Sequence, residues 1–285
     1  MSDSSPQRPR RKRPAVAPIV MIGALAVIVL GAVLFRGERE KKAAVVPPPP
    51  PPPPASLALP PPPLTRVEIV QEARRAASAF AIGAKPTLTK SPLIGRRFTV
   101  RIPFGCGGPG VSSPTAQADV ELDPTTSALK LSARPATWTS LPALADVPNA
   151  DRIETVEGFW IPRPWVDSEA CPARRDPPLP ATPTPAAAQT VGLAQIFEKG
   201  GSRVLMRNDH PYEFVRKLPK DDATLLGHSY HLVLEGRLVG FGDGRAIHCW
   251  SESADHRPIC LYAVTYDRVA FEDATSGAVL AEWRD

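Results

Sequence analysis

The clearest feature of the hydrophobic pattern is an uncharged apolar run from residue 15 to residue 35. As a helix this run spans about 32 Å at ~1.5 Å per residue, which matches the ~30 Å hydrocarbon core of a bilayer. It is longer than the ~7–15 apolar residues of a signal peptide, and it continues into charged residues at 36–42 instead of a small-residue cleavage site. The sequence therefore predicts a signal anchor, with one transmembrane helix at 15–35 in contact with lipid.

A second periodic pattern predicts an amphipathic helix that begins after residue 64. Thr65 and Glu68 have the spacing of a capping box, which satisfies backbone N–H groups at the start of a helix. Gly83 is a stop signal for the same helix. Between them, apolar residues recur at helical spacing, and we expect this stripe to pack on the sheet that follows: Val67, Val70, Ala73, Ala77 and Phe80.

The rest of the sequence carries short alternating patterns that are typical of strands. Candidate strands in the first half are 98–104, 118–122, 129–131 and 153–161. Those in the second half are 190–197, 203–207, 212–217, 230–234, 237–241, 247–250, 261–271 and 278–283, with hairpin turns expected at Glu235-Gly236 and Thr275-Ser276-Gly277. The predicted fold is mainly β with one N-terminal amphipathic helix (α+β), preceded by the transmembrane helix and a polyproline linker.

Two proline-rich segments divide the chain. Residues 36–63 are first charged and then rich in proline, with eight consecutive prolines at 47–54. Because polyproline II rises ~3.1 Å per residue, 47–63 would reach about 50 Å as a stiff spacer. A disordered linker and a ligand for proline-binding modules are the alternatives.

The second proline-rich segment, 172–188, cannot continue a sheet ladder because proline lacks the backbone N–H. It is therefore either a long surface loop or a linker. We favour a linker between two packed β lobes, 64–171 and 189–285.

The net charge of +5 is concentrated around the predicted span. Residues 1–42 hold nine of the 34 Lys and Arg residues and three of the 29 acidic residues, which leaves 25 basic and 26 acidic residues for the rest of the chain. A near-neutral folded part gives no basic face for nucleic acid. The basic tail, 1–14, favours a cytoplasmic N-terminus. We therefore expect an inner-membrane protein with its C-terminal domain in the periplasm.

This layout of tail, single span, proline-rich rod and C-terminal domain resembles that of TonB-type energy transducers of the bacterial envelope. The resemblance covers layout only. In that family the span carries a polar Ser and a His on which energy coupling depends, and residues 15–35 contain neither. The resemblance therefore implies a domain held away from the membrane, and it transfers no functional residue.

The four cysteines favour two disulfides in an exported domain. Chain proximity pairs Cys249 with Cys260 and leaves Cys106 to pair with Cys171. The alternatives are free thiols or a zinc site, because zinc accepts His and Cys ligands. The candidate zinc ligands are His248, Cys249, His256 and Cys260, although their spacing matches no standard zinc finger.

The segment around residues 158–165 is the most distinctive candidate for binding. Trp160, Arg163 and Trp165 surround two prolines, and they either form an exposed shelf for a sugar ring or a peptide or belong to the core at a strand end. The sequence contains no nucleophile elbow, H-E-x-x-H motif or P-loop, and no pattern that calls for a cofactor.

We therefore expect a non-enzymatic module that binds or assembles with an envelope protein or the cell wall. The alternative is an envelope-tethered enzyme of the hydrolase type, with a site assembled from scattered residues.

Overall fold

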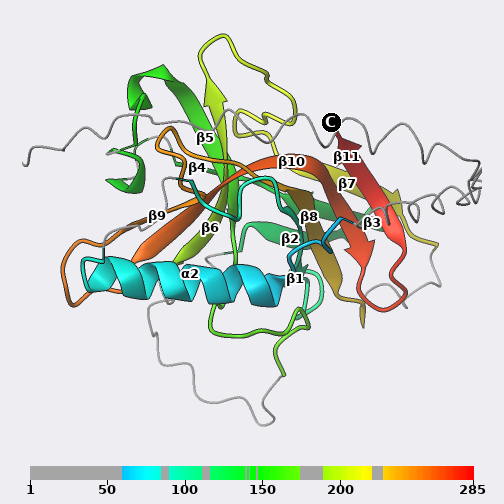
Figure 1. Cartoon of the computed structure of the whole chain (residues 1–285). Coiled ribbons are helices and arrows are strands. Elements are labelled where there is room, and N and C mark those ends of the chain that lie inside the picture. The colour runs from blue at the N-terminus through cyan, green and yellow to red at the C-terminus, as the bar shows by residue number, and fades with distance from the viewer. Residues whose placement is uncertain are drawn as a thin grey trace, which may run out of the picture. The chain divides into compact units, whose positions relative to one another are not determined.

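The computed structural model describes residues 60–84, 90–110, 116–138, 140, 142–145, 147–173, 189–219 and 227–285 (Figure 1). Residues Leu59–Asp285 form one compact unit. The predicted tail and membrane helix, the spacer up to residue 59, and most of the proline-rich segment 172–188 lie outside the described residues. Within the described ranges, no helix combines the length and the apolar composition needed to cross a membrane.

The described part of the chain is mainly β with one α-helix, which confirms the predicted α+β class. The helix is α2 (Arg66–Ala81), and the short 3-10 helices η1 (Pro142–Leu144) and η2 (Ala150–Arg152) lie between β4 and β5. The strands are β1 (Arg97–Phe104), β2 (Ala118–Asp123), β3 (Ala128–Ala133), β4 (Ala136–Thr137), β5 (Ile153–Trp160), β6 (Val191–Glu198), β7 (Tyr212–Lys217), β8 (Tyr230–Leu238), β9 (Ile247–Trp250), β10 (Ile259–Asp273) and β11 (Val279–Arg284).

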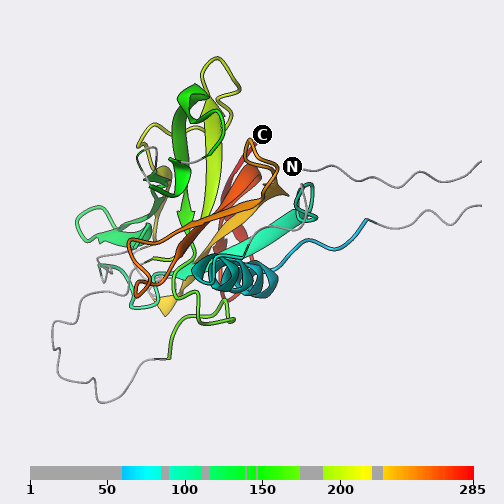
Figure 2. The same ribbon diagram turned by 60° about the vertical axis from the view of Figure 1, so that its left-hand side comes forward.

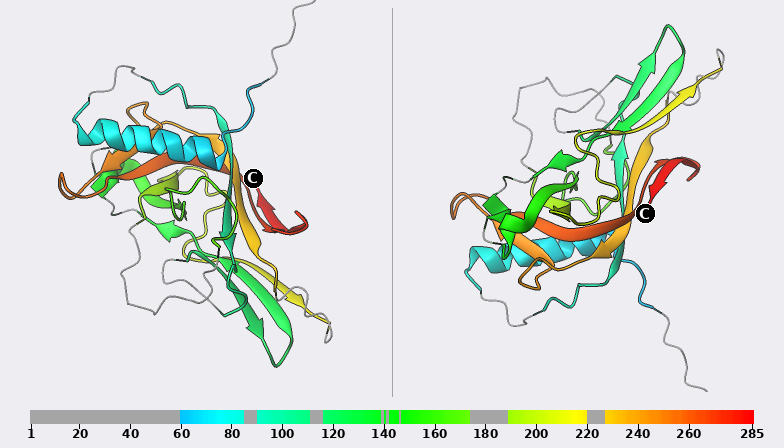
Figure 3. Two further views of the ribbon diagram at one scale, coloured as in Figure 1. Left: turned by 90° about the horizontal axis from the view of Figure 1, so that it is seen from below. Right: turned by 90° about the horizontal axis from the view of Figure 1, so that it is seen from above.

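The strands form two sheets. The larger has eight strands in the order β1-β8-β10-β6-β5-β4, and β9 and β11 also pair with β10. The long strand β10 pairs with β9 and β6 in its first half and with β8 and β11 in its second half. The smaller sheet has the order β2-β3-β7 and projects on the side away from α2 (Figure 3). Strand β6 runs parallel to β10, and the other pairs are antiparallel.

The eight-stranded sheet combines strands from both of the predicted lobes. Strand β1 pairs with β8, and β5 pairs with β6, so residues from 64–171 and from 189–285 alternate across one sheet. The proline-rich sequence between them therefore does not predict whether the strands before it pair with the strands after it, because strand pairing is decided by side chains far apart in the sequence.

Helix α2 begins and ends where the sequence predicts. The Thr65 backbone N–H donates a hydrogen bond to the Glu68 carboxylate at 2.7 Å, as in a capping box. The helix ends at Ala81, and Gly83 follows with a φ of 65°, which a glycine adopts without steric strain.

The apolar stripe of α2 is covered along only part of its length. Ile69, Val70 and Ala73 are buried where the helix packs against β1, β9 and β10, along one side of the sheet (Figures 1 and 2). One and two turns later, Ala77 is half-buried and the Phe80 side chain is 43% exposed. The expectation that the whole stripe packs on the sheet is therefore wrong for its C-terminal half, because the helix extends beyond the sheet surface that covers it.

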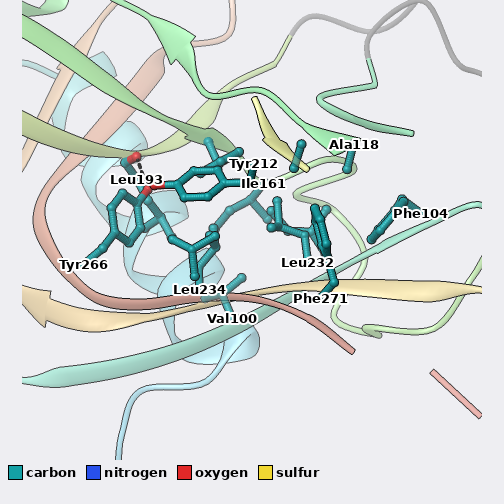
Figure 4. Packing of buried hydrophobic residues seen from close by; sticks show 14 of the residues in the cluster. Val100, Phe104, Ala118, Ile161, Leu193, Tyr212, Leu232, Leu234, Tyr266 and Phe271 are labelled. Carbon is teal, nitrogen blue, oxygen red and sulfur yellow. Dashed lines mark hydrogen bonds between the residues drawn. The ribbon is translucent and has the colours of Figure 1, made fainter. Parts of the chain in front are cut away.

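The main core combines buried residues of the larger sheet, the smaller sheet and α2, and it is rich in aromatic rings. Phe104, Phe271 and Trp283 form a chain of ring contacts, with centroid distances of 5.6 Å and 5.4 Å. The buried Tyr266 hydroxyl donates a hydrogen bond to the Leu193 carbonyl at 2.8 Å (Figure 4). The burial of these large side chains supplies most of the apolar area that stabilises the fold.

Two of the predicted local features differ in the structure. The hairpin turn expected at Glu235-Gly236 is instead the interior of β8, where a Cβ on Gly236 would lie 2.1 Å from the Thr265 carbonyl oxygen. This glycine permits close approach of β10 and does not form a turn. The strand expected at 203–207 is a loop, because the backbone N–H groups of Arg207 and Asn208 donate hydrogen bonds to the Glu157 carboxylate, each at 2.7 Å, instead of to a neighbouring strand.

Candidate binding pocket

Trp165 lies on a tight turn just after β5. The Val166 N–H donates a hydrogen bond to the Arg163 carbonyl at 2.9 Å and closes the turn Arg163-Pro164-Trp165-Val166. Pro164 suits the second position of such a turn because its ring fixes φ. The turn places the Trp165 side chain, which is 50% exposed, at the surface.

The carbonyl groups of this segment are held by two arginines of α2. The Arg66 guanidinium donates hydrogen bonds to the carbonyls of Pro162 at 2.6 Å and of Arg163 and Val166 at 3.2 Å each. About two turns of helix further on, Arg74 donates to the Pro164 carbonyl at 2.9 Å. Because Arg66 is only 2% exposed, it fixes the segment against the helix from the inside.

The charge of Arg66 is compensated by peptide dipoles and distant charges instead of by a direct ion pair. Burial lowers the pKa of its guanidinium, and the neighbouring Arg163 lowers the pKa further. An arginine nevertheless stays protonated at neutral pH. Arg66 is therefore a buried cation that faces three carbonyl oxygens, and hydrogen bonds from a charged donor are stronger than neutral ones.

A pocket of about 300 Å³ opens between this segment, α2 and the start of β10. This volume lies at the lower end of the ~300–1,000 Å³ of typical ligand sites. The pocket is lined mainly by small apolar side chains, with Trp165 and two arginines beside them. Its lining residues are Ala73, Arg74, Ala77, Pro164, Trp165, Thr190, Val191, Arg257, Pro258 and Cys260.

The charged groups of the pocket are mostly positive. Arg74 approaches the Asp167 carboxylate at 3.6 Å, but both side chains are about half exposed (48% and 53%), so this ion pair is weak. Arg257, on the exposed loop between β9 and β10, has no hydrogen bond or ion pair with any described residue. The pocket thus offers one unpaired cation and one weakly paired cation beside an apolar wall.

Both predicted disulfides are present, and each secures one wall of the pocket. Cys249 and Cys260 are directly opposite in the β9–β10 register and close the base of the loop that carries Arg257. Cys106 pairs with Cys171 and ties the end of the Trp165 segment to the residues just after β1. Two disulfides fit a domain that lies in an oxidising, extracytoplasmic compartment.

The Cys249–Cys260 disulfide also argues against the alternative interpretation of these residues as a zinc site. Cys249 and Cys260 are bonded to each other and offer no thiolate to a metal. His248 instead approaches the Asp243 carboxylate at 3.1 Å, and His256 lies near the Ser253 hydroxyl at 2.8 Å. The described residues contain no cluster of three or more His, Cys, Asp or Glu side chains arranged to hold a metal.

The structure separates the two tryptophans of the predicted shelf. Trp160, at the end of β5, packs against Trp138 with ring centroids 4.6 Å apart and belongs to the edge of a second apolar cluster. Trp165 lines the pocket, and Arg163 contributes its carbonyl to the Arg66 site. The core interpretation therefore describes Trp160, while the exposed interpretation describes Trp165.

Other ionisable pairs have structural roles. The His228 imidazole contacts the Asp273 carboxylate at 2.5 Å, and the same carboxylate accepts hydrogen bonds from the N–H groups of Thr275 and Ser276 in the β10–β11 turn. The pocket that Trp165 lines has no His or carboxylate among its described lining residues. A larger and more open hollow of about 650 Å³ over β2, β3 and β7 has Glu121 and Asp123 but no His among its described lining residues. Neither hollow brings a base and a nucleophile together.

Sequence reasoning did not identify three of the residues that form this site. Arg66 and Arg74 are eight residues apart in a helix whose sequence shows only its apolar stripe as a pattern. Arg257 lies in a loop with no motif. The one available signal was the i, i+8 spacing of Arg66 and Arg74, which places both on nearby faces of a helix.

Comparisons with protein-family models, with curated proteins and with solved structures found no match for this chain.

Proposed function

We propose that this chain is a single-pass inner-membrane protein that holds its disulfide-stabilised β domain in the periplasm, where the pocket beside Trp165 binds a protein or cell-wall partner of the envelope. Two features support the location. The run at 15–35 has the length and apolarity of an anchor, and the two disulfides fit an oxidising compartment.

The binding role depends on one observation: Trp165 is half exposed, yet its backbone is fixed. An exposed tryptophan on a mobile loop would lose side-chain and backbone freedom on binding, which weakens affinity. Here the segment is already held by Arg66, Arg74 and the Cys106–Cys171 disulfide. A preorganised aromatic side chain beside a small apolar pocket is typical of the residues that dominate interface energetics.

The location is tested by reporter fusions at the C-terminus, after Asp285. Alkaline phosphatase folds to an active enzyme only after export, whereas green fluorescent protein exported in an unfolded state stays dark. We expect an active phosphatase fusion in the membrane fraction. A fluorescent, phosphatase-negative pair of fusions would contradict the proposed topology.

The binding role is tested by photo-crosslinking in intact cells that express the full chain. A photoreactive phenylalanine derivative replaces Phe80, which lies one turn beyond the pocket wall, and in a control replaces Val215, which is 60% exposed on β7. We expect a discrete adduct from position 80 only. Ala77→Trp fills the pocket and should abolish the adduct, whereas the neighbouring exposed Ser78→Trp should retain it. An adduct that survives Ala77→Trp would show that the pocket is not the binding site.

A further inference from the structure

The apolar wall of the pocket indicates what occupies its interior. Ala73, Ala77 and Val191 expose small side chains toward a cavity that a single larger side chain can fill, and the Trp165 ring forms one rim. Filling such a cavity with an apolar group removes apolar surface of both partners from water. We therefore expect an aliphatic or aromatic group in the cavity.

The polar groups of the lining argue against a neutral sugar. A sugar ring presents several hydroxyl groups, and each needs a partner when it is buried. Apart from the two arginines and the Trp165 indole N–H, Thr190 is the only lining residue with a polar hydrogen-bonding side-chain group among the described residues of the pocket. Cationic side chains without matching acceptors favour a ligand with a negative charge.

The arginines define where this negative charge would lie. The guanidinium of Arg257 is unpaired among the described residues, and Arg74, which also donates a hydrogen bond to the Pro164 carbonyl, has a weak ion pair with Asp167. A planar guanidinium can donate hydrogen bonds to both oxygens of a carboxylate at once. The charge on the ligand therefore lies next to its apolar group, near the mouth of the pocket.

The apolar face of α2, which is buried at Ala73 and exposed at Phe80, indicates that the ligand is longer than one side chain. Ala73, Ala77 and Phe80 follow one another along the same face of the helix, and Phe80 is 43% exposed beyond the pocket. The row rises by about 10 Å at ~1.5 Å per residue. Alternate side chains of an extended peptide are ~7 Å apart, so two of them fit along this row.

We infer that the pocket binds an acidic peptide segment of a protein partner, with one apolar side chain in the cavity, a second against Phe80, and a carboxylate at the rim of the pocket facing Arg257 and Arg74. This inference rests on the proposed function, since it assigns the partner class of the same pocket. Both disulfides and Arg66 hold the two walls in place, so the peptide meets a formed site.

The experiment uses the full chain in detergent micelles and three fluorescein-labelled peptides. The first is Gly-Glu-Leu-Glu-Leu-Gly, the second has Gln in place of each Glu, and the third has Gly in place of each Leu. Fluorescence anisotropy gives the affinity of each. We expect the first peptide to bind about fivefold more tightly than the second, as for an exposed ion pair, and the third to show no saturable binding.

Variants assign the effect to this pocket. Arg257→Gln should remove the preference for the Glu peptide and leave the affinity for the Gln peptide unchanged. Arg216→Gln, an exposed arginine on β7, is the matched control and should change neither affinity. Ala77→Trp should abolish binding of both peptides. Circular dichroism and the free-thiol content of each variant confirm that it is folded and oxidised.

The possible results separate the two proposals. Equal binding of the Glu and Gln peptides, abolished by Ala77→Trp, would overturn the acidic preference and leave the binding role intact. Binding of soluble cell-wall glycan fragments instead of any peptide, again sensitive to Ala77→Trp, would overturn the peptide class alone. No binding of any probe, together with no crosslink at position 80, would overturn both.

Discussion

Replacing Arg66 with methionine tests whether this buried cation holds the Trp165 segment in place. The substitution removes three hydrogen bonds, at 2.6, 3.2 and 3.2 Å. It leaves the carbonyls of Pro162 and Val166 without this donor, while the Arg163 carbonyl keeps only the Val166 N–H. Hydrogen bonds to a charged group contribute ~1.5–3 kcal/mol each. Relief from burying a charge offsets part of this loss. We therefore expect the free energy of unfolding to fall by about 2–4 kcal/mol, which is large for a single substitution.

The assay is urea unfolding of the full chain in detergent, followed by far-ultraviolet circular dichroism and tryptophan fluorescence. Arg75→Met is the matched control, because Arg75 is on the same helix but exposed and ion-paired only with Glu72; its effect should stay below about 0.5 kcal/mol. Acrylamide quenching, compared with Trp165→Phe in the same background, reports on Trp165 itself, and Arg66→Met should make it more accessible. A loss below about 1 kcal/mol with unchanged quenching would refute the argument, since water would then satisfy the carbonyls equally well.

Three further predictions concern the rest of the fold. The entropy of loop closure predicts that removing the Cys106–Cys171 disulfide, with a sequence separation of 65, lowers the free energy of unfolding by about 4 kcal/mol. For Cys249–Cys260, with a separation of 11, the expected loss is about 3 kcal/mol. Urea unfolding of the two double Cys→Ala variants measures which loss is larger. Burial raises the pKa of Asp243, but hydrogen bonds from Arg245 and His248 outweigh it and lower the pKa to about 2. The folded pKa is thus below the unfolded value of ~3.9, so this stabilisation is complete above about pH 5 and lost as the pH falls toward about 2. Asp243→Asn should flatten that slope in unfolding measured across the same range. A Cβ at Gly158 would lie 2.0 Å from the Leu193 carbonyl oxygen, so Gly158→Ala should lower the melting temperature by the equivalent of about 1–3 kcal/mol, while Gly227→Ala, with open space around it, should not.

Local signals in the sequence predicted local structure well. The capping box at Thr65 and Glu68, the stop at Gly83 and the turn at Thr275-Ser276-Gly277 all depend on residues within a few positions of one another. The same is true of the β9–β10 hairpin, whose short connection makes Cys249–Cys260 the nearest pairing. Once that pair is formed, the other two cysteines have only each other.

The predictions that failed required contacts between distant parts of the chain. Gly236 looks like a turn glycine until the Thr265 backbone is placed against it. Residues 203–207 look like a strand until the Glu157 carboxylate accepts hydrogen bonds from the N–H groups of Arg207 and Asn208. In each case a group about 30 to 50 positions away decides the local structure, and periodicity contains no information about it.

The candidate site could be predicted from the sequence only in part, because it too depends on contacts between distant parts of the chain. The pair of tryptophans around two prolines indicated the correct segment, because large aromatic side chains contribute strongly to the energetics of cores and interfaces. Which ring is exposed depends on Trp138, which follows β4 and packs against Trp160, and on α2, which leaves Trp165 half exposed. The arginines that complete the pocket have no sequence pattern of their own.

The stabilising features of this domain converge on the pocket. Arg66, the capped first turn of α2 and both disulfides act on the same two segments, the turn that carries Trp165 and the loop that carries Arg257. An apolar contact could fix this loop without the free-energy cost of desolvating a charge, so stability alone does not explain an arginine buried against carbonyls. The arrangement is efficient if the loop must be rigid while its tryptophan stays exposed, since the anchor then acts on the backbone and leaves the side chain available. A binding site has that requirement, and a simple surface turn does not.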